Sequence, residues 1–229
     1  MARRTILRQR AWGEAILDRL DDTYVPPELT KHVRAFKAAQ AGLVSATRRA
    51  TAERERRDAA LLAVGRADGA LERAVLGLGK KLRAVGLGEP NNPFAGRSSQ
   101  SPAKLVLLEP PRAARETARV LAKLRGVKAP SAVKKAMAAC AEASRAVEAA
   151  CARVETAQKS YARALDARDA LLHKWTTALA RLRRRADQVW SESPDVLALI
   201  FAPLGEDEVA AVLDLKPVLP TVMNGVHTS

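Results

Sequence analysis

The stretch that decides the fold runs from Val133 to Val189 and reads VKKAMAACAEASRAVEAACARVETAQKSYARALDARDALLHKWTTALARLRRRADQV. Steps of alternately four and three residues meet apolar side chains at all but three positions of this stretch. Such a repeat, sustained over many turns, keeps one apolar stripe facing one partner helix, as in a coiled coil. Because no glycine or proline interrupts residues 131–193, we expect a single long helix there.

Residues 29–85 follow the same repeat, with their polar exceptions grouped towards the middle. Both stretches hold 57 residues (85−29+1 and 189−133+1), or about 85 Å of helix. Equal lengths joined by a connector indicate an antiparallel hairpin in which residue i lies opposite residue 218−i. This register places Phe36 beside Leu182. It also places Arg57 beside Tyr161, where a cation–π contact can form.

The sequence therefore predicts an all-α fold, an elongated antiparallel coiled-coil hairpin with short flanking helices that is in part a three- or four-helix bundle. We call the hairpin end near the chain termini the base and the other end the tip. Residues 1–27 are expected to form an N-terminal amphipathic helix on the base, and residues 28–86 the first long helix. Residues 87–130 are expected to form a loop and a short connector helix at the tip, and residues 131–191 the second long helix. Residues 192–229 are expected to form an acidic C-terminal segment that folds back on the base and frays at its end.

The base is expected to collect most of the large side chains. Six of the eight aromatic residues fall in segments that the hairpin brings to this end: Trp12, Tyr24, Phe36, Trp175, Trp190 and Phe201. The apolar run at 196–201 is expected to pack there, because so many adjacent apolar side chains are unfavourable in water. A last short helix is expected over residues 206–215, with acids in its first turn, where the helix dipole favours them.

Small side chains form a second stripe on both long stretches. A further apolar stripe exceeds what two helices can bury, so it indicates contact with the connector helix or with a second copy of the chain. An equally good explanation is that alanine occurs at these positions simply because it has the highest helix propensity, without any contact to a further helix. The candidate self-association stripe comprises Ala60, Ala63, Ala67, Ala70, Ala74, Gly77, Ala136, Ala139, Ala143, Ala146, Ala150 and Ala157.

The net charge of +14 is carried by the helical body, whereas residues 192–229 are acidic. A basic body can attract nucleic acid, an anionic membrane surface or an acidic protein, or it can simply be a solvated face. Phosphate contact through such groups would be independent of sequence and sensitive to salt. The candidate polyanion contacts are Lys31, Arg34, Lys37, Arg48, Arg49, Lys80, Lys81, Arg83, Lys134, Lys135, Arg181, Arg183, Arg184 and Arg185.

No catalytic, cofactor-binding or metal-binding motif stands out in the sequence. His32 and His173 each follow an acid by four residues, a spacing typical of surface pairs on a helix. Cys140 and Cys151 lie about 16 Å apart along one helix, too far for a disulfide within one chain, and are expected to be reduced. The alternative is a bridge between two chains of an antiparallel dimer. No apolar run is long enough to span a membrane. A cytoplasmic location is therefore expected, with no cofactor and no small-molecule substrate.

The favoured function is that of a non-enzymatic structural or adaptor protein that works through helix-mediated self-association, as a dimer, or through a protein partner. The alternative is a non-specific binder of polyanions, either nucleic acid or an anionic membrane surface, that uses the basic helical body.

Overall fold

The computed structural model describes residues 2–205 and 208–209, and within these residues all regular secondary structure is helical. The fold is all-α, with two long helices, α2 and α5, that pack against each other. The helices of the described part are α1 (Ala2–Asp21), α2 (Pro27–Ala84), α3 (Pro102–Leu105), α4 (Pro110–Leu124), α5 (Ser131–Val189) and α6 (Pro194–Ile200).

Proline and glycine set the ends of the helices. α2, α3, α4 and α6 each begin with a proline, whose missing N–H and fixed φ suit the first helical turn. α2 ends just before Gly86, which has a φ of +69°, a conformation that glycine adopts without strain. Both long helices begin and end within two residues of the expected ranges 28–86 and 131–191.

The chain divides into two compact units, described separately below. Unit 1 comprises residues 1–49 and 166–229, and unit 2 comprises residues 50–165. Both long helices contribute to both units, because α2 passes from unit 1 to unit 2 after Arg49 and α5 passes back after Leu165.

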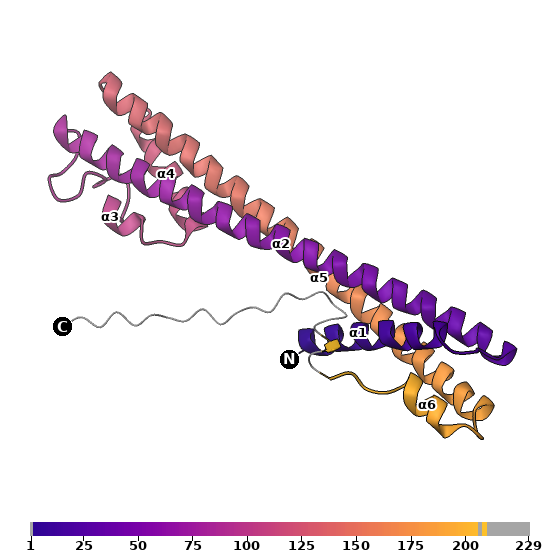
Figure 1. Cartoon of the computed structure of the whole chain (residues 1–229). Helices are drawn as coiled ribbons and strands as arrows, with labels where there is room; N and C mark the ends of the chain where they lie inside the picture. The colour runs from indigo at the N-terminus through magenta and orange to yellow at the C-terminus, as the bar shows by residue number, and fades with distance from the viewer. Residues whose placement is uncertain (1, 206–207, 210–229) are drawn as a thin grey trace, which may run out of the picture. The chain divides into compact units, whose positions relative to one another are not determined.

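In unit 1, α1 and α6 pack on the antiparallel pair formed by the first turns of α2 and the last turns of α5 (Figure 1). The core is built around the Trp175 ring, whose centroid lies 6.4 Å from that of Trp12 and 5.8 Å from that of Phe36. Ile200 and Phe201 are buried in the same cluster. The apolar run at 196–201 therefore folds against this core, as its composition predicts.

A buried amide joins three helices of unit 1. Gln40 of α2 is only 3% exposed. Its Oε1 accepts a hydrogen bond of 2.6 Å from Trp175 Nε1 on α5, and its Nε2 donates one of 2.8 Å to the backbone oxygen of Arg10 on α1. Gly13 makes room for this amide, because a Cβ there would collide with the Gln40 side chain. Each polar atom of Gln40 thus has a partner where burial would otherwise be costly.

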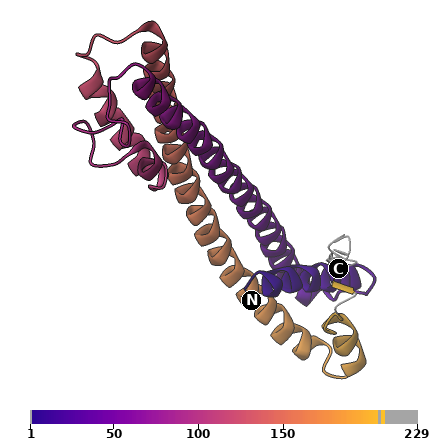
Figure 2. The ribbon, with the colours of Figure 1, turned by 90° about the vertical axis from the view of Figure 1, so that its left-hand side faces the viewer.

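In unit 2, α3, α4 and the loop before them pack on the last turns of α2 and the first turns of α5 (Figure 2). This core is aliphatic, apart from Phe94 of the loop, which is 1% exposed. Gly79 lets the loop come close, because a Cβ there would lie 2.8 Å from Pro102 Cγ. Phe94 anchors residues 89–105, whose sequence, EPNNPFAGRSSQSPAKL, is rich in polar and turn-forming residues.

Between this core and the unit boundary, unit 2 contains a stretch that we call the two-helix segment, residues 51–66 of α2 and 152–163 of α5. None of its side chains is fully buried in the described structure. The guanidinium of Arg57 lies 4.7 Å from the centroid of the Tyr161 ring. The predicted cation–π pair is therefore confirmed, and with it the antiparallel pairing of α2 and α5 in this unit.

One expectation for unit 1 needs correction, and one lies beyond the described residues. Phe36 packs on Trp175 and shares its cluster with Leu182, the residue expected opposite it. Tyr24, expected in the core, is 79% exposed, because it stands in the turn between α1 and α2. The helix expected over 206–215 falls almost entirely outside the described residues.

Candidate binding surfaces

A groove in unit 1 brings together positively charged side chains that are not adjacent in the sequence. It lies between α2 and α5, has a volume of about 530 Å³, and is called the cationic groove below. Two lysines, one arginine and two histidines line it, with small side chains between them. The lining residues are Lys31, His32, Ala35, His173, Lys174, Thr177, Ala178 and Arg181.

Helical spacing brings these residues to one surface. On α5, Lys174, Ala178 and Arg181 follow one another at intervals of four and three, which keeps them on one face of the helix. On α2, Lys31 and Ala35 have the same relation. Because the two helices run antiparallel, the two faces border one groove, with alanines and Thr177 where longer side chains would fill it. No carboxylate lines the groove.

The fourteen predicted polyanion contacts do not form one surface. Only Lys31 and Arg181 line the cationic groove. Lys37 lies 3.8 Å from the carboxylate of Asp21, the guanidinium of Arg183 lies 5.9 Å from the Phe201 ring centroid, and Arg185 donates a hydrogen bond of 2.8 Å to Gln188.

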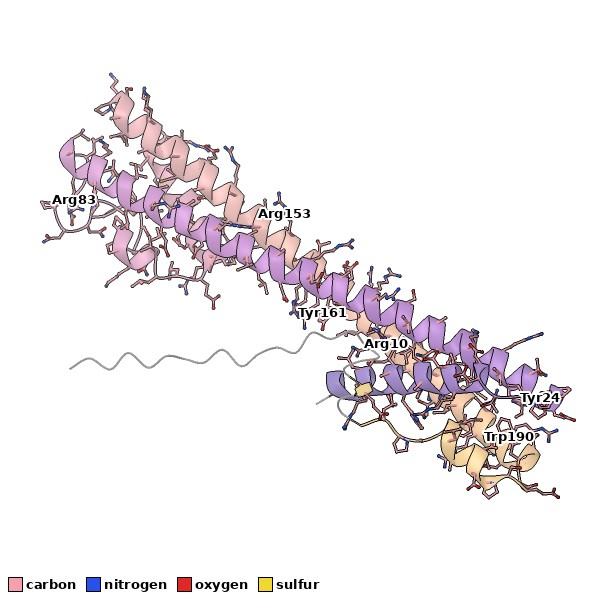
Figure 3. The ribbon with its side chains drawn as sticks, in the orientation of Figure 1. Arg10, Tyr24, Arg83, Arg153, Tyr161 and Trp190 are labelled. Atoms are coloured by element: carbon pink, nitrogen blue, oxygen red, sulfur yellow. The ribbon has the colours of Figure 1, made fainter. Side chains whose placement is uncertain are left out.

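The remaining members of that set are solvent-exposed and divided between the units. In unit 1 they are Arg34, Arg48, Arg49 and Arg184. In unit 2 they are Lys80, Lys81, Arg83, Lys134 and Lys135. Arg83 extends from the surface near the end of α2 (Figure 3). Sequence reasoning left Lys174 out of the cation candidates and interpreted the two groove histidines as members of surface pairs, because helical spacing alone does not define the face that the two helices share.

The two histidines also differ from their expected role. Neither His32 nor His173 forms an ion pair with the acid four residues before it, as far as the described residues go. Asp169 instead accepts two hydrogen bonds from the neighbouring Arg168, the shorter of 2.7 Å. His173 is exposed and His32 is half-buried, and both face the cationic groove.

The stripe of small residues is split by the fold of unit 2. Ala143 and Ala150 are buried, and Ala67, Ala74 and Ala136 are half-buried against the core that includes α4. α4, which is the expected connector helix, therefore covers part of the stripe. The others are half-buried or exposed: Ala60, Ala63, Ala70, Gly77, Ala139, Ala146 and Ala157.

The two-helix segment displays apolar side chains that nothing in the described structure covers. Leu61, a position of the 4-3 repeat, is 49% exposed, and its neighbour Leu62 is 69% exposed. A shallow groove of about 410 Å³ also lies in this segment. Its lining mixes one acid, two arginines and small side chains: Glu53, Arg56, Ala152, Arg153, Thr156, Ala157 and Ser160.

The shifted pKa values have structural causes. Burial raises the pKa of the Cys140 thiol to about 12, which keeps it protonated and unreactive at neutral pH. Burial and the nearby charge of Asp68 raise the pKa of Cys151. A hydrogen bond from Lys159 lowers the pKa of the exposed Glu155. None of these groups lines the cationic groove.

Within residues 2–205 and 208–209, no group of acids, histidines and cysteines is arranged to hold a metal ion. No helix of that part is both long and apolar enough to cross a membrane. Comparison of the chain with protein-family models, with curated proteins and with solved structures finds no match.

Proposed function

We propose that the chain is a non-enzymatic adaptor that dimerises through the two-helix segment of unit 2. The observation that carries this proposal is the exposure of Leu61 and Leu62 on a helix whose repeat is that of a buried seam. Two helices alone shield a seam on one side only, whereas four helices enclose it.

A second copy of the chain is the partner that the charges favour. The shallow groove of the two-helix segment carries Glu53 beside Arg56 and Arg153, so an antiparallel copy can set acids against arginines. Its floor of Ala152, Ala157 and Ser160 leaves room for side chains of an incoming helix. We further propose that the long helices wind as a coiled coil, which the burial of Leu71, Val75, Leu78 and Leu82 at 4-3 spacing supports.

We place the protein in the reducing cytoplasm. Both cysteines of the chain are free, and Cys140 is wholly buried, as suits a protein that does not depend on disulfides. No catalytic step is part of the proposal.

The test is the oligomeric state of the full chain, measured by size-exclusion chromatography with light scattering at low and high salt. We expect a dimer at both, because apolar burial is not screened by ions. The double variant Leu61→Glu/Leu62→Glu should weaken dimerisation about thirtyfold or more, equal to roughly 2 kcal/mol. The matched control, Leu107→Glu/Leu199→Glu, changes two leucines that are also exposed but lie elsewhere and should remain dimeric. A monomeric wild type, or equal loss in both variants, would refute the proposal.

A second candidate function is non-specific binding of duplex DNA or anionic vesicles. It is favoured by the exposed cations that lack an ion pair among the described residues, such as Arg48, Arg49, Lys134 and Lys135. Binding should fall steeply with salt and be indifferent to base sequence. The absence of binding at low salt would exclude it.

A further inference from the structure

The cationic groove is a concave surface of unit 1 where positive charge converges from two helices and no carboxylate lines the groove. Lys31, Lys174 and Arg181 have no ion-pair or hydrogen-bond partner among the residues that the structure describes. Like charges gathered in this way repel one another, which costs free energy in the absence of a ligand. An anion in the groove would relieve that cost.

The donor set is suited to phosphate. Arg181 can present two parallel N–H groups to phosphate oxygens, and the ammonium groups of Lys31 and Lys174 act as point charges. The imidazoles of His32 and His173 can each donate an N–H, whether neutral or charged. The volume of about 530 Å³ lies within the range of small-ligand sites, roughly 300–1,000 Å³.

Three nearby cations have contacts of their own, which favours a compact ligand in this groove over a long polyanion. Lys37 pairs with Asp21, Arg183 faces Phe201, and Arg185 bonds to Gln188. A duplex would need a row of free cations along its backbone. In unit 1 the unpaired lining cations converge on one groove whose small residues, Ala35, Thr177 and Ala178, leave room for a ligand between the two helices.

We propose that the cationic groove binds a compact ligand carrying two or more phosphate charges, either a soluble phosphorylated molecule or a lipid headgroup. Lys174 and Arg181 hold the phosphate from α5, Lys31 holds it from α2, and His32 and His173 donate hydrogen bonds at its edge. This assignment does not depend on dimerisation, since every residue of the groove belongs to unit 1, whereas the proposed dimer contact lies in unit 2.

The first experiment titrates the full chain with inorganic pyrophosphate and follows the imidazole C–H resonances by NMR. The chain has three histidines, and the variants His32→Asn and His173→Asn assign the two that line the groove. We expect both resonances to shift together and to saturate at one ligand per chain. Shifts that rise without saturation, or that an equal concentration of chloride reproduces, would overturn the proposal.

The second experiment compares two double variants that each remove one lysine and one arginine from α5. Lys174→Ala/Arg181→Ala should weaken pyrophosphate binding at least about tenfold, because two charge-assisted contacts are lost. Lys134→Ala/Arg184→Ala removes the same charge from exposed positions that do not line the groove and should bind as the wild type does. Equal weakening in both variants would show that only net charge matters and would overturn the proposal.

A third arm identifies the source of the phosphate. Binding to vesicles that contain phosphatidic acid, displaced by pyrophosphate and lost in Lys174→Ala/Arg181→Ala, assigns the groove to a lipid headgroup. Saturable pyrophosphate binding without vesicle binding assigns it to a soluble ligand. Binding of duplex DNA that depends on Lys174 and Arg181, in a chain that does not bind pyrophosphate, would replace the proposal.

Discussion

The two units of the chain form their hydrophobic cores from different kinds of side chain. Unit 1 packs Trp12, Phe36 and Trp175 around a buried amide whose oxygen and nitrogen each have a hydrogen-bond partner. Unit 2 packs leucines, valines and alanines, with Phe94 as its one buried aromatic. Large rings bury more area for each residue ordered. Unit 1 therefore concentrates its stabilisation in a few residues, whereas unit 2 distributes it over many.

The difference extends to the two-helix segment, which lacks a core of its own. The third layer over α2 and α5 comes from α1 and α6 in unit 1, and from α4 and the loop that carries Phe94 in unit 2. Where neither is present, positions of the 4-3 repeat are occupied by Arg57 and Tyr161, or leave Leu61 half-exposed. A long apolar repeat is thus not equivalent to a continuous core.

The largest expected effect is at Trp175. Trp175→Ala should destabilise the protein by about 3–5 kcal/mol, because it removes a side chain that is 1% exposed and leaves the Gln40 carbonyl without its donor. Tyr161→Ala, in the two-helix segment, should cost less than about 1 kcal/mol. Urea denaturation followed by circular dichroism measures both. Similar losses for the two variants would contradict the contrast between concentrated and distributed stabilisation.

Two glycine-to-alanine substitutions should change the stability of the protein in opposite directions. Gly13→Ala brings a methyl group into the Gln40 amide and should cost about 2 kcal/mol through lost hydrogen bonds. Gly65→Ala, in the two-helix segment, has nothing within 4 Å of the new Cβ and should stabilise by about 0.5–1 kcal/mol, since alanine has the higher helix propensity. The melting temperatures of the two variants, each compared with that of the wild type, test both expected changes in stability. A stabilised Gly13→Ala would show that the amide is not tightly held.

A smaller effect is expected at Ser144 in the core of unit 2. Its hydroxyl is buried and has no hydrogen-bond partner among the described residues, a cost that the satisfied Gln40 avoids. Ser144→Ala should therefore raise stability by about 1 kcal/mol. Ser45→Ala, at an exposed position of α2, is the control and should change stability by less than about 0.5 kcal/mol. A loss of stability at Ser144 would mean that the hydroxyl has a partner in solution.

The smallest effect concerns Asp68, the one acid of the 4-3 repeat. Burial, and then the charge of Glu72, raise the pKa of its carboxyl above the ordinary value. The folded protein then holds this proton more tightly than the unfolded chain does, so stability falls as pH rises through the range between the two pKa values. Asp68→Asn should be slightly more stable than the wild type at pH 7. The difference should vanish at pH values below the ordinary pKa of aspartate, as parallel thermal melts would show.

Much of the fold follows from sequence because its signals are local and repeated. The 4-3 repeat predicted both long helices, the prolines and glycines predicted their ends, and the equal lengths predicted the pairing of Arg57 with Tyr161. What escaped prediction depends on particular three-dimensional fits. Phe94 could not be recognised as a core residue within a polar loop. The exposure of Tyr24 depends on the direction of one turn.

The candidate surfaces were less predictable, since each combines residues from both long helices. Lys31 and Arg181 were singled out for their charge, but their union with His32, His173 and Lys174 requires the helix register to within about one turn. A repeat of apolar positions fixes that register less closely, because apolar side chains recur at every third or fourth residue. The stripe of small residues is a pattern that the sequence alone displays. Which of its members α4 covers could be learned only from the packing of unit 2.

The division of the chain between the units bears on the order of events during synthesis. Unit 2 is one uninterrupted segment, whereas unit 1 joins residues 1–49 to residues beyond 165. On the ribosome, the aliphatic core can assemble once Leu165 has emerged, whereas Trp12 and Phe36 must wait for Trp175 and Phe201 before their own core can close. Such non-local contacts form late and slowly. The apolar side chains of the N-terminal helix therefore wait longest for their core partners during synthesis, and this helix is the segment of the nascent chain that a chaperone would protect most.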